Sequence, residues 1–183
     1  MIKKVIVLLA EGFEEVEAIT PIDYLRRAGI EVTVAAIGNG LTVKGTRGVS
    51  VNADMSLREA GTSSFDAVVI PGGMPGAANL AASKEAGDLI KEMAAGGKLV
   101  CAICASPAVV LSPLGLLAGK RFTCYPGMEE KVKDGKWTEE DVVSDGNIIT
   151  SRAAGTAGKF AVMIIVRLLG ESEGDKVAKA VLL

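Results

Sequence analysis

Four short apolar runs constrain the fold of this chain more than any other feature, because each has the length and character of a buried strand. They cover residues 3–10, 31–36, 65–70 and 99–103. Runs rich in Val, Ile and Leu are typical of parallel strands that helices cover on both faces. Helical segments follow these runs along most of the chain. Strands that alternate with helices predict an α/β fold around a mainly parallel sheet.

The other segments supply the expected helices and hairpins. The helix predicted at 14–27 has glutamates in its first turn and Arg26-Arg27 in its last, and Pro21 should kink it or make it restart. Further helices are predicted at 83–95, 107–117 (bent or ended by Pro113), 157–169 and about 175–182, a short strand at 121–124, and hairpins at 41–51 and 142–150. Together they predict a single-domain, flavodoxin-like α/β fold over residues 1–183: a doubly wound sandwich with a mainly parallel central sheet and a small β-hairpin at 41–51.

Composition limits the class of partner. With 183 residues, of which 49% are hydrophobic and 23% charged, the chain can bury one sizeable core. A formal net charge of −2 without a Lys/Arg cluster gives no electrostatic footprint for nucleic acid or an anionic membrane, so a small molecule or a protein is the expected partner. The first apolar run ends at Glu11 and is read as a core strand rather than a targeting segment. Three cysteines without a secretory signal favour a reduced, cytoplasmic protein.

The sequence contains no histidine, which excludes whole classes of catalytic site. Ser-His-Asp and Cys-His machinery cannot be built within one subunit, and neither can a metal site based on imidazole. We therefore expect no metal, and any catalysis must use Cys, Glu, Asp, Lys, Arg or Tyr.

Cys104 follows the strand at 99–103 directly, and Ser106-Pro107 then starts the next helix. A strand-to-helix turn exposes a nucleophile at the end of a sheet, and the free N–H groups of the helix start favour a thiolate. The alternative is that Cys104 is a small buried hydrophobe, as free cysteines often are. Cys101 lies inside the strand and is expected to serve packing. A thioredoxin-like Cys-x-x-Cys dithiol is a weaker alternative, because its first cysteine would lie within the sheet.

Two other features should lie at the same edge of the sheet, because ligand sites of such folds lie beyond the carboxyl ends of the strands. They are the acidic helix start with Glu14 and Glu17, after the first strand, and the Gly72-Gly73 pair, after the third. Taken alone, Glu17 could be a solvated first-turn carboxylate and the two glycines only a turn.

In this order and spacing, four motifs resemble the ThiJ/PfpI superfamily, and within it the branch of the bacterial YajL-type proteins and the human parkinsonism-associated protein deglycase. The motifs are Glu14-Glu15-Val16-Glu17 with Arg26-Arg27-Ala28-Gly29, Val69-Ile70-Pro71-Gly72-Gly73, Ala102-Ile103-Cys104-Ala105-Ser106-Pro107, and Thr150-Ser151-Arg152 with Gly155-Thr156. The resemblance runs nearly from end to end. It implies that Cys104 is the reactive cysteine, that Glu17 is the carboxyl group beside it, and that Gly72, Gly73 and Ala105 offer backbone donors near the thiol.

The resemblance also implies a homodimer that packs partly through the first helix. Arg27 and Arg47 match positions that family members bring toward the dimer interface near the site, although exposed ion pairing is the simpler interpretation. Tyr125 stands before Pro126 where the deglycase branch often has a histidine. Tyrosine can donate a hydrogen bond but cannot shuttle protons near neutral pH, so a mechanism that needs that histidine is in doubt. PfpI-type proteases carry a histidine after the cysteine, where this chain has Ala105.

Two functions fit these residues. The resemblance implies a cofactor-independent enzyme for reactive carbonyls, either a glyoxalase or a deglycase that acts on glycated proteins, with Cys104 as nucleophile and Glu17 as general acid and base. The alternative is a redox-responsive stress protein or chaperone that senses oxidants through Cys104 without turnover. For both, we expect Cys104 to be a thiolate at neutral pH while Glu17 holds the proton of the pair.

Overall fold

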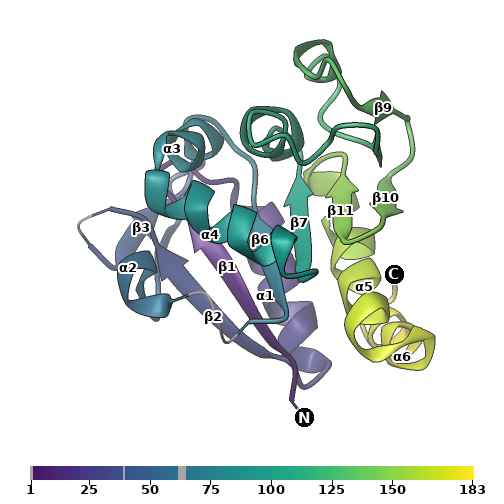
Figure 1. Ribbon diagram of the computed structural model, residues 1–183. Helices are drawn as coiled ribbons and strands as arrows, with labels where there is room; N and C mark the ends of the chain where they lie inside the picture. The colour runs from purple at the N-terminus through teal and green to yellow at the C-terminus, as the bar shows by residue number, and fades with distance from the viewer. Residues whose placement is uncertain (1, 39, 62–64) are drawn as a thin grey trace.

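The computed structural model describes residues 2–38, 40–61 and 65–183, and its centre is a seven-stranded sheet between two helical layers (Figure 1). The strand order is β10-β11-β7-β6-β1-β2-β5. These strands are β1 (Lys4–Leu9), β2 (Glu31–Ala36), β5 (Met55–Ser56), β6 (Ala67–Ile70), β7 (Leu99–Ile103), β10 (Val142–Asp145) and β11 (Ile148–Ser151). All pairs are parallel except β10 with β11. The order of the five inner strands is that of flavodoxin-like sheets, as the alternating pattern predicts.

Helices cover both faces of the sheet and enclose a separate core on each. One core includes α1 (Glu15–Arg27), α5 (Ala157–Leu169) and α6 (Glu171–Ala180), and Phe13 and Phe160 are among its fully buried side chains. The other includes α2 (Leu57–Ala60), α3 (Gly76–Ala82) and α4 (Lys84–Ala95), which lies in front of the sheet in Figure 1. Strands β6 and β7 are buried along their whole length, which explains why their sequences are continuously apolar.

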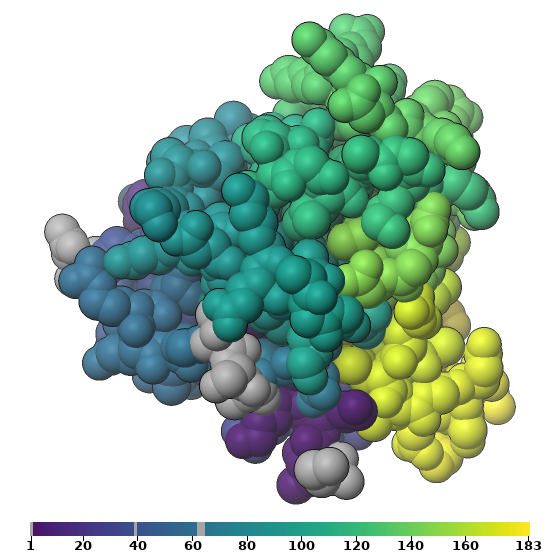
Figure 2. Space-filling view, in the orientation of Figure 1, coloured from purple at the N-terminus to yellow at the C-terminus, as the bar shows by residue number. Residues whose placement is uncertain are grey.

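Two small pairs of strands lie outside the main sheet. Strands β3 (Thr42–Lys44) and β4 (Ser50–Asn52) pair antiparallel and confirm the hairpin predicted at 41–51. Strands β8 (Arg121–Phe122) and β9 (Lys136–Trp137) form a second pair, within the green segment that projects from the body in Figure 2. In Figure 1, β9 lies beyond the end of β11, and β3 lies on the opposite side of the molecule.

Several predicted elements differ from the structure. Helix α1 continues through Pro21, whose side chain is buried beside Ala18 and Leu25, and this packing keeps one helix where a restart was expected. The predicted helix at 107–117 is a π-helix, Pro107–Leu111, which ends two residues before Pro113.

The strand expected at 121–124 shortens to β8 and pairs outside the main sheet. Helix α6 begins at Glu171, four residues before the predicted start near 175, because Gly170 separates it from α5. Among the residues that the structure describes, no helix combines the length and apolar character needed to cross a bilayer.

Candidate active site

Cys104 lies at a strained turn between β7 and the π-helix. Its φ angle is 64°, in the left-handed region that residues other than glycine rarely adopt. Such a conformation costs roughly 1–3 kcal/mol and persists only where the surroundings hold it. Two backbone hydrogen bonds hold it here: the N–H of Cys104 donates to the carbonyl of Ser151 at 2.9 Å, and its own carbonyl accepts from the N–H of Tyr125 at 2.8 Å. The predicted elbow is therefore present.

Ser106, which is fully buried, ties this turn to the neighbouring strand. Its Oγ donates to the carbonyl of Pro71 at 2.6 Å, next to the glycine pair. In the sequence, Ser106 indicates only the start of the helix that follows Cys104. Nothing in its spacing signals that the hydroxyl would join the Cys104 turn to the Gly72-Gly73 loop.

Glu17 is the buried carboxyl group of the site, with an exposed fraction of 1%. It lies in the first turn of α1, where its N–H donates to the capping carboxylate of Glu14 at 2.8 Å. Its Oε2 accepts from the N–H of Gly72 at 2.9 Å, and its side chain is hydrogen-bonded to the thiol of Cys104. The interpretation of Glu17 as a solvated carboxylate is therefore wrong.

The two glycines are needed because the loop passes close to these groups. A Cβ at Gly72 would lie 2.6 Å from Oε2 of Glu17 and 2.7 Å from the Cβ of Cys104. Gly73 has a φ angle of +85°, and a Cβ there would lie 2.5 Å from the backbone nitrogen of Glu14. Gly73 and Ala105 donate backbone N–H groups to the sulfur of Cys104, whereas the N–H of Gly72 is taken by Glu17. The glycine pair thus supports both members of the Cys–Glu pair.

The pKa of Glu17 agrees with the predicted ionisation of the pair, whereas the pKa of Cys104 does not. Burial raises the pKa of Glu17 from 4.5 to about 7, the charge of Glu14 adds to this, and hydrogen bonds from Cys104, Gly72 and Ala154 oppose it. Burial also raises the pKa of Cys104, as do the negative charge and hydrogen bonding of Glu17, while Ala105 and Gly73 lower it. The raised pKa of Cys104 contradicts our prediction of a persistent thiolate.

The physical reason is that α1 buries the sulfur beside a second acid, which the elbow alone does not reveal. Above about pH 7, where Glu17 has lost its own proton, one proton remains for Cys104 and Glu17 to share. When the carboxyl group holds that proton, its charge no longer opposes the thiolate, and the two N–H donors remain directed at the sulfur. The pair can therefore form a thiolate by an internal proton transfer.

A cavity of about 600 Å³ opens above Cys104. Its lining residues are Glu14, Glu17, Thr46, Arg47, Gly73, Met74, Cys104, Ala105, Tyr125, Met128, Ala153, Ala154 and Gly155. Thr46 and Arg47 come from the β3–β4 turn, and residues 153–155 follow β11. Tyr125, half exposed, lies at the rim. Thr46, Met74 and Met128 were not predicted, because no sequence motif marks these three positions.

The sequence-predicted residues do not all converge. Cys104, Glu17, Gly73, Ala105, Tyr125 and Arg47 line the cavity, and Gly72 supports Glu17 from behind. Arg27 does not reach it within one chain: it ends α1, ten residues beyond Glu17 or roughly 15 Å along the helix, and its Nε donates to Asp23 at 2.7 Å. Cys101 is fully buried, as expected for a packing residue. Burial raises the pKa of Cys124 to about 12, so this thiol is also protonated near neutral pH.

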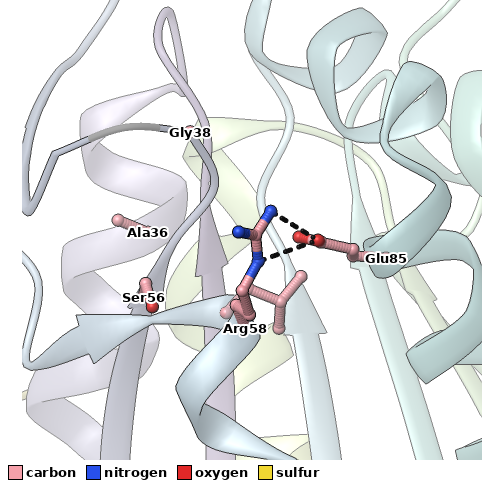
Figure 3. Close-up of a pocket in the computed structure, with 6 residues that line it drawn as sticks. Ala36, Gly38, Ser56, Arg58 and Glu85 are labelled. Atoms are coloured by element: carbon pink, nitrogen blue, oxygen red, sulfur yellow. Dashed lines mark hydrogen bonds and ion pairs between the residues drawn. The ribbon is translucent and has the colours of Figure 1, made fainter.

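A second hollow, near the ends of β2 and β5, contains Ser56, Arg58 and Glu85 (Figure 3). Two guanidinium nitrogens of Arg58, Nε and Nη2, donate to Oε1 of Glu85 at 3.2 and 3.0 Å. Because the charged groups of this hollow already satisfy each other, it offers no unpaired reactive group comparable with Cys104.

Comparison with known proteins shows which family this chain resembles. The model of the DJ-1/PfpI family matches residues 3–167. Protein dj-1beta of Drosophila melanogaster is 44% identical over 184 residues, which cover 100% of this chain and 98% of that protein. A protein of Pyrococcus abyssi named as a deglycase is 37% identical over 155 residues, covering 83% of this chain and 91% of that protein.

The Arabidopsis thaliana protein DJ-1 homolog B is 44% identical over 98% of this chain, but this chain spans only 41% of that protein's length. Among solved structures, Drosophila melanogaster DJ-1beta superposes with a TM-score of 0.96 at 43% identity, covering 100% of this chain and 99% of that one. Toxoplasma gondii DJ-1, in a structure described as oxidized, has a TM-score of 0.96 at 39% identity and covers 98% of each chain.

Proposed function

Because this chain belongs to the DJ-1/PfpI family, we propose that it is a cofactor-independent enzyme that acts on reactive carbonyl compounds through Cys104, in the manner of a glyoxalase or a deglycase. The observation that carries this proposal is the hydrogen bond between the buried carboxyl group of Glu17 and the thiol of Cys104 on one wall of the cavity. A nucleophile within reach of a proton acceptor of matched pKa is the minimum that carbonyl addition requires.

The first step joins the sulfur to the aldehyde carbon. Glu17 as carboxylate accepts the thiol proton while Cys104 attacks the aldehyde carbon. Glu17 then gives this proton to the aldehyde oxygen, so that a hemithioacetal forms and Glu17 is a carboxylate again. Backbone N–H groups of Gly73 and Ala105 stabilise the charge on sulfur before the bond forms.

The second step moves hydrogen between neighbouring carbons. With methylglyoxal, Glu17 removes the proton from the carbon that bears sulfur and returns one to the adjacent carbon, so that the hemithioacetal becomes a thioester of lactate. This isomerisation has no net oxidation and needs no external electron acceptor. Water then hydrolyses the thioester, which releases lactate and restores the thiol. A group with a pKa of about 7 can serve as both acceptor and donor in this sequence near neutral pH.

The second candidate is a redox-responsive stress protein or chaperone in which oxidation of Cys104 alters a partner surface. The observation that favours it is accessibility: Cys104 borders the cavity, whereas Cys101 and Cys124 are buried. The structure of a related protein, Toxoplasma gondii DJ-1, is described as oxidized. Hydrogen bonds from Gly73 and from a protonated Glu17 would stabilise an oxidised sulfur.

The deciding experiment measures lactate formed from methylglyoxal by purified protein without glutathione. We expect slow but measurable turnover that Cys104→Ser abolishes. Cys124→Ser is the matched control, because it makes the same atomic change at a buried cysteine outside the cavity. Equal activity in wild type and Cys104→Ser, or none in wild type at high enzyme concentration, would remove the enzyme proposal and leave the redox-responsive protein.

A further inference from the structure

Ser106 is fully buried, and the proposed chemistry does not use it. It precedes Pro107 at the start of the π-helix, a position where a serine hydroxyl commonly caps a helix by accepting a backbone N–H. Within residues 104–112, all of which the structure describes, the side chain of Ser106 makes no such capping bond. Its Oγ instead donates to the carbonyl of Pro71 at 2.6 Å and so joins the turn after β7 to the end of β6. Helix capping therefore does not explain this hydroxyl.

The carbonyl of Pro71 and the N–H of Gly72 belong to one peptide unit, which is trans. Because a trans peptide is planar, its carbonyl and its N–H point in opposite directions, and fixing one end fixes the direction of the other. Ser106 holds the carbonyl end, and the N–H end donates to Oε2 of Glu17 at 2.9 Å. The hydroxyl of Ser106 thus sets the direction of a hydrogen bond to the proposed proton acceptor without contacting that group.

The next peptide unit is arranged in the same way. The carbonyl of Gly72 accepts the N–H of Glu14 at 3.0 Å, while the N–H of Gly73 donates to the sulfur of Cys104. Two consecutive peptide units are therefore held at their carbonyls and present their N–H groups to the Cys–Glu pair. One of the two groups that hold these carbonyls is a backbone N–H. The other is the hydroxyl of Ser106, which a substitution can remove without changing the backbone.

Gly72 makes the first of these peptide units easy to turn. A glycine has no Cβ to restrict its φ angle, and this position needs glycine because a Cβ would lie 2.6 Å from Oε2 of Glu17. A rotation of the unit would direct the carbonyl oxygen of Pro71, rather than the N–H, toward Glu17. An oxygen in that place would disfavour a carboxylate. The hydroxyl of Ser106 opposes this rotation, because it donates to the carbonyl in the observed orientation.

Replacing Ser106 changes no charge near Glu17. The titratable and charged groups around this carboxyl group come from the cap of α1, from the turn after β7 and from the cavity wall at the β3–β4 turn: Glu14, Cys104 and Arg47. All three are retained in a Ser106 variant. A change in the ionisation of Glu17 in such a variant would therefore arise from the orientation of its backbone donors.

We propose that Ser106 is a positioning residue for the Cys104–Glu17 pair, because its hydroxyl keeps the N–H of Gly72 directed at the carboxyl group. Replacement of Ser106 by alanine should leave the nucleophile, the acid and the cavity in place and remove only this orientation. The inference rests on the proposed function for its effect on turnover, but the orientation of the peptide unit can be measured without turnover.

The first test follows the amide proton of Gly72 by NMR in isotope-labelled protein. In wild type, its chemical shift should change as Glu17 titrates around pH 7, because the amide is hydrogen-bonded to the carboxylate, and Glu17→Gln should remove this change. In Ser106→Ala, we expect the change to fall by roughly half or more and its midpoint to move to higher pH. A Gly72 amide that titrates in Ser106→Ala as it does in wild type overturns the proposal.

The second test measures kcat/KM for methylglyoxal against pH. A hydrogen bond to a carboxylate favours its charged form, so loss of this bond should move the fall in kcat/KM, expected near pH 7 in wild type, to higher pH. We expect Ser106→Ala to be roughly tenfold slower than wild type at about pH 6 and roughly equal to it at about pH 9. An equal loss of kcat/KM at every pH would indicate a purely structural role and overturns the proposal.

Two variants serve as controls. Ser83→Ala makes the same atomic change at a hydroxyl that accepts the N–H of Ala86 in the cap of α4, outside the cavity, and it should change neither the Gly72 amide nor the pH profile. A profile shifted as in Ser106→Ala would show that lost stability, rather than orientation, is the cause. Ser106→Thr keeps a hydroxyl donor and should restore the titration of the Gly72 amide, and failure to restore it in the folded protein contradicts the role of the hydroxyl.

Two other outcomes are also decisive. If Ser106→Ala does not fold, Ser106→Cys, whose thiol is a weaker donor of similar shape, should reduce the titration of the Gly72 amide, and an amide that titrates as in wild type overturns the proposal. Absence of turnover in wild type contradicts the proposed function, while the Gly72 amide still reports on Ser106.

Discussion

Replacing Glu17 by glutamine should make the protein more stable at alkaline pH while it abolishes carbonyl turnover. The pKa of Glu17 rises from 4.5 in the unfolded chain to about 7 in the folded protein, chiefly because the carboxyl group is buried. Between these two values the folded state binds more protons than the unfolded state. The contribution of Glu17 to stability is therefore highest below pH 4.5 and declines as the pH rises to about 7.

The size of the effect follows from the shift. Each pKa unit corresponds to about 1.4 kcal/mol. The shift of Glu17 therefore means that its ionisation lowers the free energy of unfolding by roughly 3 kcal/mol above pH 7. Glu17→Gln cannot ionise, and its amide oxygen can still accept the N–H of Gly72. We expect the variant and wild type to be about equally stable near pH 4.5 and the variant to be more stable by roughly 3 kcal/mol at pH 8.5.

The assay is urea unfolding of both proteins at intervals from pH 4.5 to 8.5. In thermal unfolding, the same difference corresponds to roughly 6–12 °C for a domain of this size. Glu130→Gln is the control, because it makes the same chemical change at an exposed glutamate. If the difference between wild type and Glu17→Gln does not change with pH, the raised pKa is wrong, and with it the role of Glu17 as a proton acceptor near neutral pH.

Three further predictions concern the same site and the state of assembly. The kcat/KM of carbonyl turnover should fall about tenfold per pH unit below about pH 7 and level off above it, because Glu17 must lose its own proton before it can accept that of the thiol. A kcat/KM that begins to fall only at pH 4–5 would contradict this. Mild peroxide should add two oxygens to Cys104 before it modifies Cys101 or Cys124, as read by peptide mass spectrometry, and earlier oxidation of either buried cysteine would show that Cys104 is not activated. Light scattering at micromolar concentration should give twice the 18.8 kDa mass of the chain, since we expect a two-fold dimer through α1, and a monomer mass would refute it.

Much of the fold could be predicted because its strongest signals are local. The apolar runs at 31–36 and 99–103 match β2 and β7 to the residue, and helix α5 matches the prediction at 157–169. The errors arise where tertiary packing overrides local preference. Pro21 remains inside α1 because its ring is buried. The segment at 121–124 lies outside the main sheet, where β8 pairs with β9, a strand that almost no sequence pattern indicates.

The site could be predicted where topology alone brings residues together. Cys104, Glu17 and Gly73 converge because strands β1, β6 and β7 are neighbours whose carboxyl ends meet at one edge. The pKa of Cys104 could not be predicted, because it depends on how deeply the folded chain buries the sulfur. The burial of Glu15 could not be predicted, because its carboxylate accepts a backbone hydrogen bond from a turn more than thirty residues later, which no local pattern links to it.

The hydrogen bond from Gly72 to Glu17 joins residues 55 positions apart, and the donor from residue 154 comes from still later in the chain. Contacts between such distant segments form late in folding, after their loop-closure entropy has been compensated. The carboxyl group that we propose as the proton acceptor of Cys104 therefore reaches its place only when α1, β6, β7 and the segment after β11 have all docked. A chain still emerging from the ribosome has this cysteine without its partner, so we expect the thiol to gain its proposed reactivity only when the native structure is complete.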